Sequence, residues 1–237
     1  MYLDLAEPGT HWVWEVMMML LRGQAETITF KKSLHMIEFN SAANIGEFQS
    51  PRVLNSHVLY ADLPHEVHTR RLKIVFVCRN PKDVAVSLYN HHVKLSEYYE
   101  YSGEFKDWLE LFVEGKVDYG SWFDYTNSWE NVIYGDRVNP IHVVMYEDMK
   151  EDPSRETKRL ADFLGVSCSS DLISAVVTKC GFDHMKEDKK PHQNHSEVMF
   201  RKAGPFGGDG TIAFVSGKRE REERSVIKVD RSCTCTY

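Results

Sequence analysis

Apolar strand-like runs alternate with helix-like segments along the first two thirds of the chain. Residues 73–78 form a continuous run of β-branched and aromatic side chains, the pattern of a strand buried on both faces of a parallel sheet. Residues 143–146 and 52–57 are further strand candidates. Residues 2–6 predict a short strand that ends at the turn signal Pro8-Gly9.

Helices are predicted between these strands. The first runs over residues 10–22, with Thr10 as its N-cap and Gly23 closing it. The second covers 81–93 and starts at Pro81, and the third covers 153–164 and stops before Gly165. This alternation predicts an α/β fold, with a central, mostly parallel sheet flanked by helices. Ligands of such folds bind at the carboxyl ends of the strands, beside helix N-termini.

Length and composition narrow the classes of function. A chain of 237 residues, 42% of them hydrophobic, suits one α/β domain with a sizeable core. A net charge of −6 argues against a general nucleic-acid binder but permits a local basic pocket for a small anion. Five scattered cysteines indicate reduced thiols in a cytoplasmic protein. The most apolar run, 12–21, is too short for a membrane span and carries Glu15.

The composition changes after residue 202. A glycine-rich stretch begins there and is followed by a run of mixed charges. We therefore expect one domain over residues 1–202 and a divergent, flexible C-terminal segment over 203–237.

Two segments are candidate anion sites. The residues from Pro8 to Trp12 join a strand to a helix start, where backbone N–H groups bind phosphate; an ordinary turn is the alternative. The segment lacks the GxxxxGK[ST] spacing, which argues against a Walker-type NTPase or nucleotide kinase. Arg79, at a strand end, and Ser87, two helical turns later, form a second candidate clamp for a phosphate monoester. A surface arginine and a helix-buried serine would account for this pair equally well.

Histidines supply the candidate general base. His57 lies just past the end of a strand, and the unperturbed pKa of histidine, near neutrality, suits a general base, although a structural role is open for any of the eleven histidines. His91 and His92 are expected to face solvent on their helix, because no ligand for a shared metal stands at a suitable spacing.

Four blocks, in this order along the chain, carry a family resemblance. They read FVCRNPKDVAVS (76–87), YGSWFD (119–124, with Trp129 beyond), YEDMKEDP (146–153) and FRK (200–202). On these blocks the chain resembles the cytosolic sulfotransferases, which move a sulfuryl group from 3′-phosphoadenosine 5′-phosphosulfate (PAPS) to a hydroxyl or amine. The resemblance implies a P-loop-like nucleotide-binding architecture.

The resemblance also assigns roles to individual positions. His57 would take the proton of the acceptor. The 3′-phosphate would be held by Arg79, Ser87, Arg201 and Lys202. The 5′-phosphosulfate would lie against Gly9, Thr10 and His11. The adenine would be lined by Trp12, Tyr146 and Phe182.

The same resemblance sets expectations for ligands and partners. The donor would leave as 3′-phosphoadenosine 5′-phosphate (PAP), and the scheme needs no metal. The acceptor would be a small alcohol, phenol or amine, with Phe30, Tyr60, Phe123 and His92 as candidate pocket residues. No nucleic acid or membrane partner is expected. A homodimer is compatible with the family, but its usual dimer motif is absent.

Departures from the family concern charge. Glu7 stands where the family has a lysine beside the leaving phosphate, and Asn55 stands where a second lysine precedes the catalytic histidine by two residues. At about 4 Å and an effective dielectric constant near 20, one unit pair interacts by roughly 4 kcal/mol, so the reversal of charge at Glu7 is a large change. Asn55 can still donate a hydrogen bond but brings no charge. The alternative is therefore a catalytically impaired, nucleotide-binding sulfotransferase-like protein. We also expect the domain to be incomplete at its N-terminus, where the family has a further segment.

Overall fold

The computed structural model describes residues 2–3, 7–30, 32–135 and 138–189. All of them belong to the compact unit Met1–Lys202. The expected boundary at residues 202 and 203 lies outside the described residues and stays a prediction.

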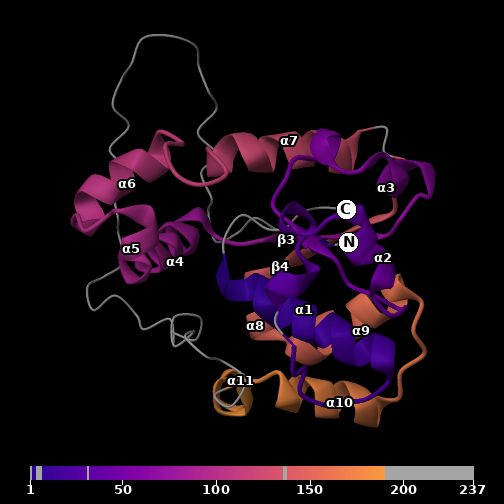
Figure 1. Ribbon diagram of the computed structural model, residues 1–237. Helices are drawn as coiled ribbons and strands as arrows, with labels where there is room; N and C mark the ends of the chain where they lie inside the picture. Colours follow the sequence, from indigo (N-terminus) through magenta and orange to yellow (C-terminus); the bar gives the residue numbers. More distant parts are fainter. Residues whose placement is uncertain (1, 4–6, 31, 136–137, 190–237) are drawn as a thin grey trace. The chain divides into compact units, whose positions relative to one another are not determined.

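A four-stranded parallel sheet with the order β2-β1-β3-β4 forms the centre of this unit (Figure 1). The strands are β1 (Tyr2–Leu3), β2 (Asn55–Ser56), β3 (Ile74–Cys78) and β4 (Ile141–Met145). The register of β3 and β4 pairs Ile74 with Ile141 and continues to Cys78 with Met145. The predicted α/β fold with a parallel sheet is confirmed, although β1 and β2 are shorter than the sequence pattern indicated.

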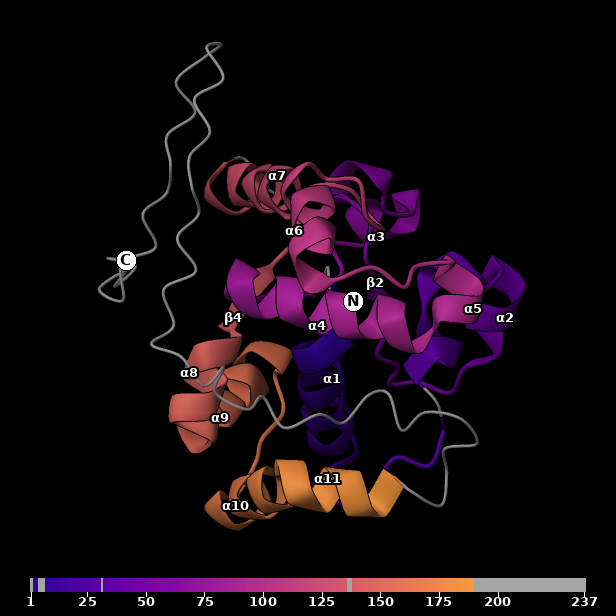
Figure 2. The same cartoon turned by 90° about the vertical axis from the view of Figure 1, so that its left-hand side faces the viewer.

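Alternate side chains of β3 enter two cores on opposite faces of the sheet. Val75 and Val77 pack among the helices α1 (Glu7–Arg22), α9 (Pro153–Leu164) and α10 (Ser170–Lys179). Ile74 and Phe76 pack on the other face, against α3 (His65–Thr69) and α7 (Trp122–Tyr134). Both views place these two groups of helices on opposite sides of the strands (Figures 1 and 2). Burial on both faces explains why β3 is apolar throughout.

Capping residues set two predicted helices. The side chain of Asn80 accepts a hydrogen bond of 3.0 Å from Lys82 N, and Pro81 opens α4 (Pro81–Lys94). Asp152 accepts a bond of 2.9 Å from Arg155 N at the start of α9, and Gly165, with φ of 79°, closes that helix. Both predictions are confirmed.

The start of α1 corrects the sequence prediction. The helix begins at Glu7 rather than after Thr10, so Thr10 is a fully buried helix residue and not an N-cap. A proline is compatible with the first turn of a helix because the N–H that it lacks has no partner there, so Pro8 does not break α1. The predicted end at Arg22 is confirmed. Gly23 adopts φ of 67°, and Gln24 N donates to Met19 O at 3.2 Å.

The remaining elements connect this frame. The α-helices are α2 (Ala42–Glu47), α5 (Ser96–Tyr99), α6 (Phe105–Val113), α8 (Tyr146–Glu151) and α11 (Phe182–Lys189), and the 3-10 helices are η1 (Lys32–His35), η2 (Ile37–Phe39) and η3 (Tyr60–Asp62). No helix within the described ranges combines the length and apolar character needed to cross a bilayer.

A smaller core between α4 and α6 contains His92, contrary to the expected solvent-facing position. Trp108 Nε1 donates to His92 Nδ1 at 3.2 Å, and His92 Nε2 lies 3.5 Å from Asp118 Oδ2. The prediction was wrong because both partners lie on segments distant in the sequence. Burial, only partly offset by Asp118, lowers the pKa of His92.

Candidate active site

The predicted site residues gather at the carboxyl edge of the sheet, because each follows one of its parallel strands. Thr10 comes after β1, His57 after β2, Arg79 after β3 and Tyr146 after β4. The carboxyl ends of parallel strands share one edge, and this is where α/β folds bind ligands. One topological rule therefore brings together residues from four distant parts of the chain.

Arg79 and Tyr146 form the best-defined contact of this edge. Each directly follows a member of the last pair in the β3–β4 register, Cys78 and Met145. The Arg79 guanidinium carbon lies 4.3 Å from the centre of the Tyr146 ring, a cation–π geometry. Asp83 Oδ2 lies 3.6 Å from Arg79 on the solvent side. Burial raises the pKa of Tyr146, and the nearby Arg79 opposes that shift, so the phenol is neutral at pH 7.

Trp12 completes an aromatic corner beside this pair. Its ring meets the Tyr146 ring edge-on, with the centroids 5.8 Å apart. Trp12 is half-buried on α1, so a flat surface remains for a ligand ring. The structure thus brings Trp12 and Tyr146 together, as their predicted adenine-binding role requires. Ser87 lies half-buried on α4, and its share in a phosphate clamp with Arg79 stays a prediction.

A buried lysine meets the first turns of α1. Lys32 opens η1 and is only 4% exposed, and its Nζ donates to Thr10 Oγ1 at 2.8 Å. Asn55 Nδ2 donates to the backbone oxygen of Lys32 at 3.1 Å, which ties η1 to β2. The neighbouring His11 is buried as well, with Nε2 3.4 Å from Glu15 Oε1.

His57 is buried at the end of β2, and Glu38 fixes its position. One carboxylate oxygen of Glu38 accepts hydrogen bonds from Ser56 Oγ, at 3.0 Å, and from the backbone N–H of His57. Burial and, to a lesser extent, the positive charge of Lys32 lower the pKa of His57 to about 3. The imidazole is therefore neutral at pH 7, the form that accepts a proton, but the low pKa makes it a weaker base than the unperturbed imidazole expected from the sequence.

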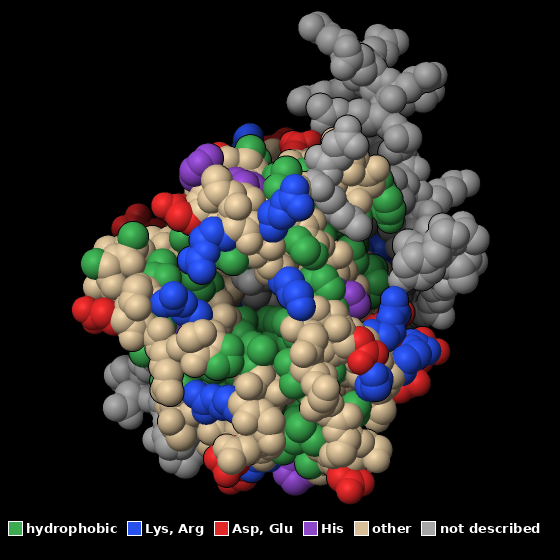
Figure 3. All heavy atoms as spheres, turned by 90° about the vertical axis from the view of Figure 1, so that its right-hand side faces the viewer, with side chains coloured by type: hydrophobic (Ala, Val, Ile, Leu, Met, Phe, Trp, Pro, Cys, Tyr) green, Lys and Arg blue, Asp and Glu red, His purple; other side chains and the backbone are tan. Residues whose placement is uncertain are grey.

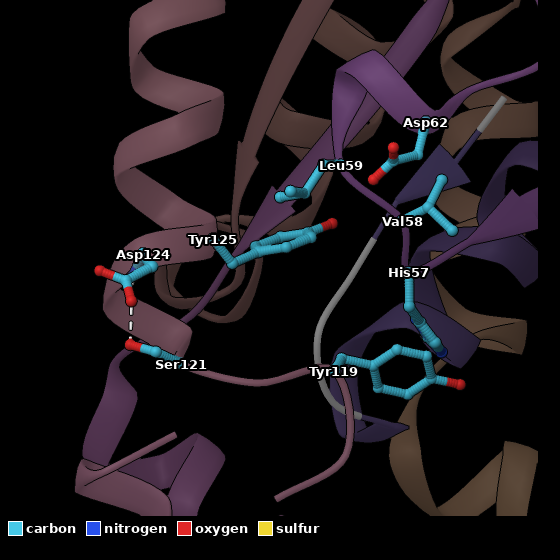
Figure 4. A pocket seen from close by; sticks show the side chains of 8 residues that line it. All are labelled: His57, Val58, Leu59, Asp62, Tyr119, Ser121, Asp124 and Tyr125. Atoms are coloured by element: carbon cyan, nitrogen blue, oxygen red, sulfur yellow. Dashed lines mark hydrogen bonds between the residues drawn. The ribbon is translucent and has the colours of Figure 1, made fainter. Parts of the chain in front are cut away.

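A hollow of about 320 Å³ opens beside His57. Figure 4 shows the His57 and Tyr119 rings together at one end and Ser121 and Asp124 at the other. The ring centroids of His57 and Tyr119 are 4.6 Å apart. The lining residues are His57, Val58, Leu59, Asp62, Tyr119, Ser121, Asp124 and Tyr125.

None of the four expected pocket residues lines this hollow. Phe30 packs edge-on against Trp14 in the core, and Tyr60 donates to Asn139 Oδ1 at 2.7 Å. Phe123 is 38% exposed, and His92 belongs to the smaller core. Sequence reasoning chose aromatic residues near the motifs, but the walls are formed by the loops that carry Leu59 and Tyr119 and by the start of α7.

The remaining nucleotide-binding candidates are Phe182, Arg201 and Lys202. Phe182 begins α11 and is 37% exposed. Arg201 and Lys202 lie outside the described residues, so their roles stay predictions. Lys32 was missed, because nothing in the sequence signals that a lysine after Phe30 is buried against Thr10.

Charge is not spread evenly, despite the net charge of −6. On the face shown in Figure 3, which is turned away from the starts of α1 and α4 (Figure 1), Lys and Arg side chains surround a hollow with a hydrophobic floor, while acidic side chains lie toward the edges. Among the described site residues, Arg79 and Lys32 bring positive charge to the sheet edge. These two cations at the carboxyl edge suit a small anionic ligand.

Comparison with known proteins decides the family. The family model described as "Sulfotransferase domain" matches residues 7–207, most of the chain. The chain belongs to the sulfotransferase family. Sulfotransferase 1A1 of Mus musculus is 30% identical, over 97% of this chain and 83% of that protein. Sulfotransferase 1E1 of the same organism is also 30% identical, over 97% and 82%.

Solved structures agree with this sulfotransferase assignment. The crystal structure of mouse sulfotransferase SULT7A1 complexed with PAP superposes with a TM-score of 0.69 at 26% identity, covering 86% of this chain and 74% of that one. A retinol dehydratase in a complex with retinol and PAP has a TM-score of 0.65 at 20% identity, covering 79% and 65%, and supports the fold alone. The expected family, fold and sulfuryl-transfer chemistry are confirmed.

Proposed function

We propose that this sulfotransferase moves the sulfuryl group of PAPS to a hydroxyl or amine of a small molecule bound beside His57. The observation that carries the proposal is the convergence of Thr10, His57, Arg79 and Tyr146 at one edge of the sheet. A donor-binding corner and a base next to a hollow are the parts that such a transfer needs.

Trp12, Arg79 and Tyr146 form the donor corner, which fits an adenosine that carries phosphate groups at its 3′ and 5′ positions. Trp12 and Tyr146 offer flat aromatic faces for the purine. Arg79 offers a planar guanidinium, which suits the 3′-phosphate. The start of α1 offers backbone N–H groups to the 5′-phosphosulfate. The mouse relative whose crystal structure contains PAP supports the same ligand here.

The transfer is an in-line displacement at sulfur. The bond from sulfur to the bridging phosphate oxygen breaks, and its electron pair stays on the leaving phosphate. The acceptor oxygen or nitrogen forms the new bond to sulfur and gives its proton to the imidazole of His57, which Glu38 and Tyr119 hold in place. Positioning and charge stabilisation carry most of the rate of such reactions.

The walls of the hollow favour a small aromatic acceptor. Tyr119 and Tyr125 present rings on which a flat substrate ring packs. Asp62 and Asp124 add carboxylates to the lining, and Asp124 lies at the end of the hollow opposite His57 (Figure 4), which favours an acceptor with a cationic group remote from its nucleophile. A phenol that carries an amine is therefore the acceptor class that we propose.

Glu7 and Asn55 favour a second candidate, a nucleotide-binding protein with weakened catalysis. The deciding experiment measures transfer of labelled sulfuryl from PAPS to a panel of phenols, alcohols and amines. Steady transfer by the unaltered chain supports the enzyme. Transfer that appears only after Glu7→Lys, with PAP affinity little changed, supports the binding protein.

Three further points remain proposals. We place the protein in the cytoplasm, on the basis of its scattered cysteines. We place the domain boundary after residue 202, and we leave a homodimer to be tested by light scattering.

A further inference from the structure

The unusual feature of the site is the position of Lys32. Its ammonium group is buried and bonded to the hydroxyl of Thr10, on the helix start proposed for the 5′-phosphosulfate. It is also close enough to His57 for its charge to act on the imidazole. Lys32 therefore lies between the donor end of the site and the base that serves the acceptor.

This is the region where the reaction gathers negative charge. The leaving phosphate gains charge as the bond to sulfur breaks, and a positioned cation stabilises that charge. The two positions at which the family has lysines carry Glu7 and Asn55 here, so neither supplies a cation. Lys32 is the buried lysine that the fold brings to the same place.

Its connection to Asn55 supports this reading. Asn55 is 1% exposed and donates through its amide to the backbone oxygen of Lys32, which holds η1 against β2. A lysine at position 55 would bring its own ammonium into this buried space. With asparagine there, the amide instead positions the residue that carries the charge.

We propose that Lys32 binds the 5′-phosphosulfate end of the donor and stabilises the leaving phosphate, in place of the lysines that this chain lacks. This inference rests on the proposed function. It adds a residue from η1, a segment that none of the recognised motifs includes.

The test compares two probes that differ only at the 5′ position, PAP and adenosine 3′-monophosphate, by isothermal titration. Lys32→Gln removes the charge and keeps a hydrogen-bonding side chain next to Thr10. We expect PAP affinity to fall about 10- to 100-fold, as for loss of a charge-assisted hydrogen bond, with affinity for adenosine 3′-monophosphate unchanged. Lys32→Arg retains most of the PAP affinity. Lys106→Gln, on the exposed face of α6, is the matched control and changes neither probe.

A second variant shows whether Lys32→Gln loses PAP affinity because it loses the charge or because it folds poorly. Lys32→Gln/Asn55→Lys returns a cation to the family's position, and we expect it to recover PAP affinity and kcat relative to Lys32→Gln. A merely structural lysine would leave the ratio of the two affinities constant across all variants.

The outcomes separate the two claims. If the unaltered protein binds PAP and Lys32→Gln binds it equally well, or weakens both probes alike, the role of Lys32 is refuted and the proposed function stands. If the unaltered protein binds neither probe, the proposed function fails and the inference fails with it.

Discussion

Replacing Arg79 tests the donor corner directly. The side chain is 8% exposed, lies over the Tyr146 ring at 4.3 Å and has Asp83 at 3.6 Å on its solvent side. Arg79→Met keeps an unbranched apolar stem and removes the charge and the hydrogen-bond donors of the side chain. Arg79→Lys keeps the charge but loses the planar fork and the stacking on the ring.

The expected loss of PAP affinity follows from the hydrogen bonds that Arg79 would donate to the 3′-phosphate. Hydrogen bonds to a charged group contribute about 1.5–3 kcal/mol, so Arg79→Met should weaken PAP binding about 10- to 150-fold. Loss of the cation–π contact with Tyr146 costs roughly 0.5–2 kcal/mol of stability. Arg79→Lys should fall between the unaltered protein and Arg79→Met in PAP affinity.

Isothermal titration with PAP and with adenosine 5′-monophosphate, which lacks the 3′-phosphate, is the assay. Arg79→Met should lose affinity for PAP and keep its affinity for the monophosphate. Arg70→Met, at the exposed end of α3, is the matched control. Equal weakening of both nucleotides, or unchanged PAP affinity, would refute a 3′-phosphate role for Arg79.

Three further predictions concern His57 and the hollow. His57→Gln should make the free energy of unfolding fall less steeply as the pH is lowered. The pKa of His57 is about 3 in the folded protein and 6.5 in the unfolded chain. The contribution of His57 to stability is therefore fully present above pH 6.5 and is lost as the pH falls toward 3. Thermal unfolding between pH 4 and 7 measures the slope. Glu38→Gln should cost about 1–3 kcal/mol, measured in urea, and lower kcat, because the charged acceptor that holds Ser56 and His57 is lost. Asp62→Asn combined with Asp124→Asn should reduce kcat/KM for a phenol with an aminoethyl group several-fold more than for the same phenol with a carboxyethyl group.

Each of these has a contradicting result. An unchanged pH slope in His57→Gln would mean that the imidazole is not buried in its neutral form. A Glu38→Gln variant with full stability and full kcat would show that the carboxylate does not position His57. Equal effects on the two phenols would remove the carboxylates from acceptor selection.

Local signals were enough to predict the frame of the fold. β3 is apolar throughout because both its faces are buried, and α9 lies between an N-capping Asp152 and a C-terminal Gly165, all readable within a few residues. Arg79 could be placed at the end of a predicted strand, whereas Tyr146, predicted as the last residue of a strand, begins α8 directly after β4.

The errors arose where long-range contacts decide. Thr10 is buried by its packing and by Lys32, 22 positions away, and His92 is buried by Trp108, 16 positions away. Part of the wall of the hollow comes from loops, and in one of them Tyr119 adopts φ of 64°, a left-handed conformation that no sequence signal at a tyrosine predicts. Such contacts depend on the assembled fold and leave no periodic pattern in the sequence.

The measurement that tests the central claim most directly pairs sulfuryl transfer with PAP binding in His57→Ala. Labelled transfer from PAPS to an amine-bearing phenol is followed beside isothermal titration with PAP on the same sample. We predict that the variant loses at least 100-fold in kcat and binds PAP as the unaltered protein does. Transfer that persists at the same rate in the variant would contradict the assignment of His57 as the base.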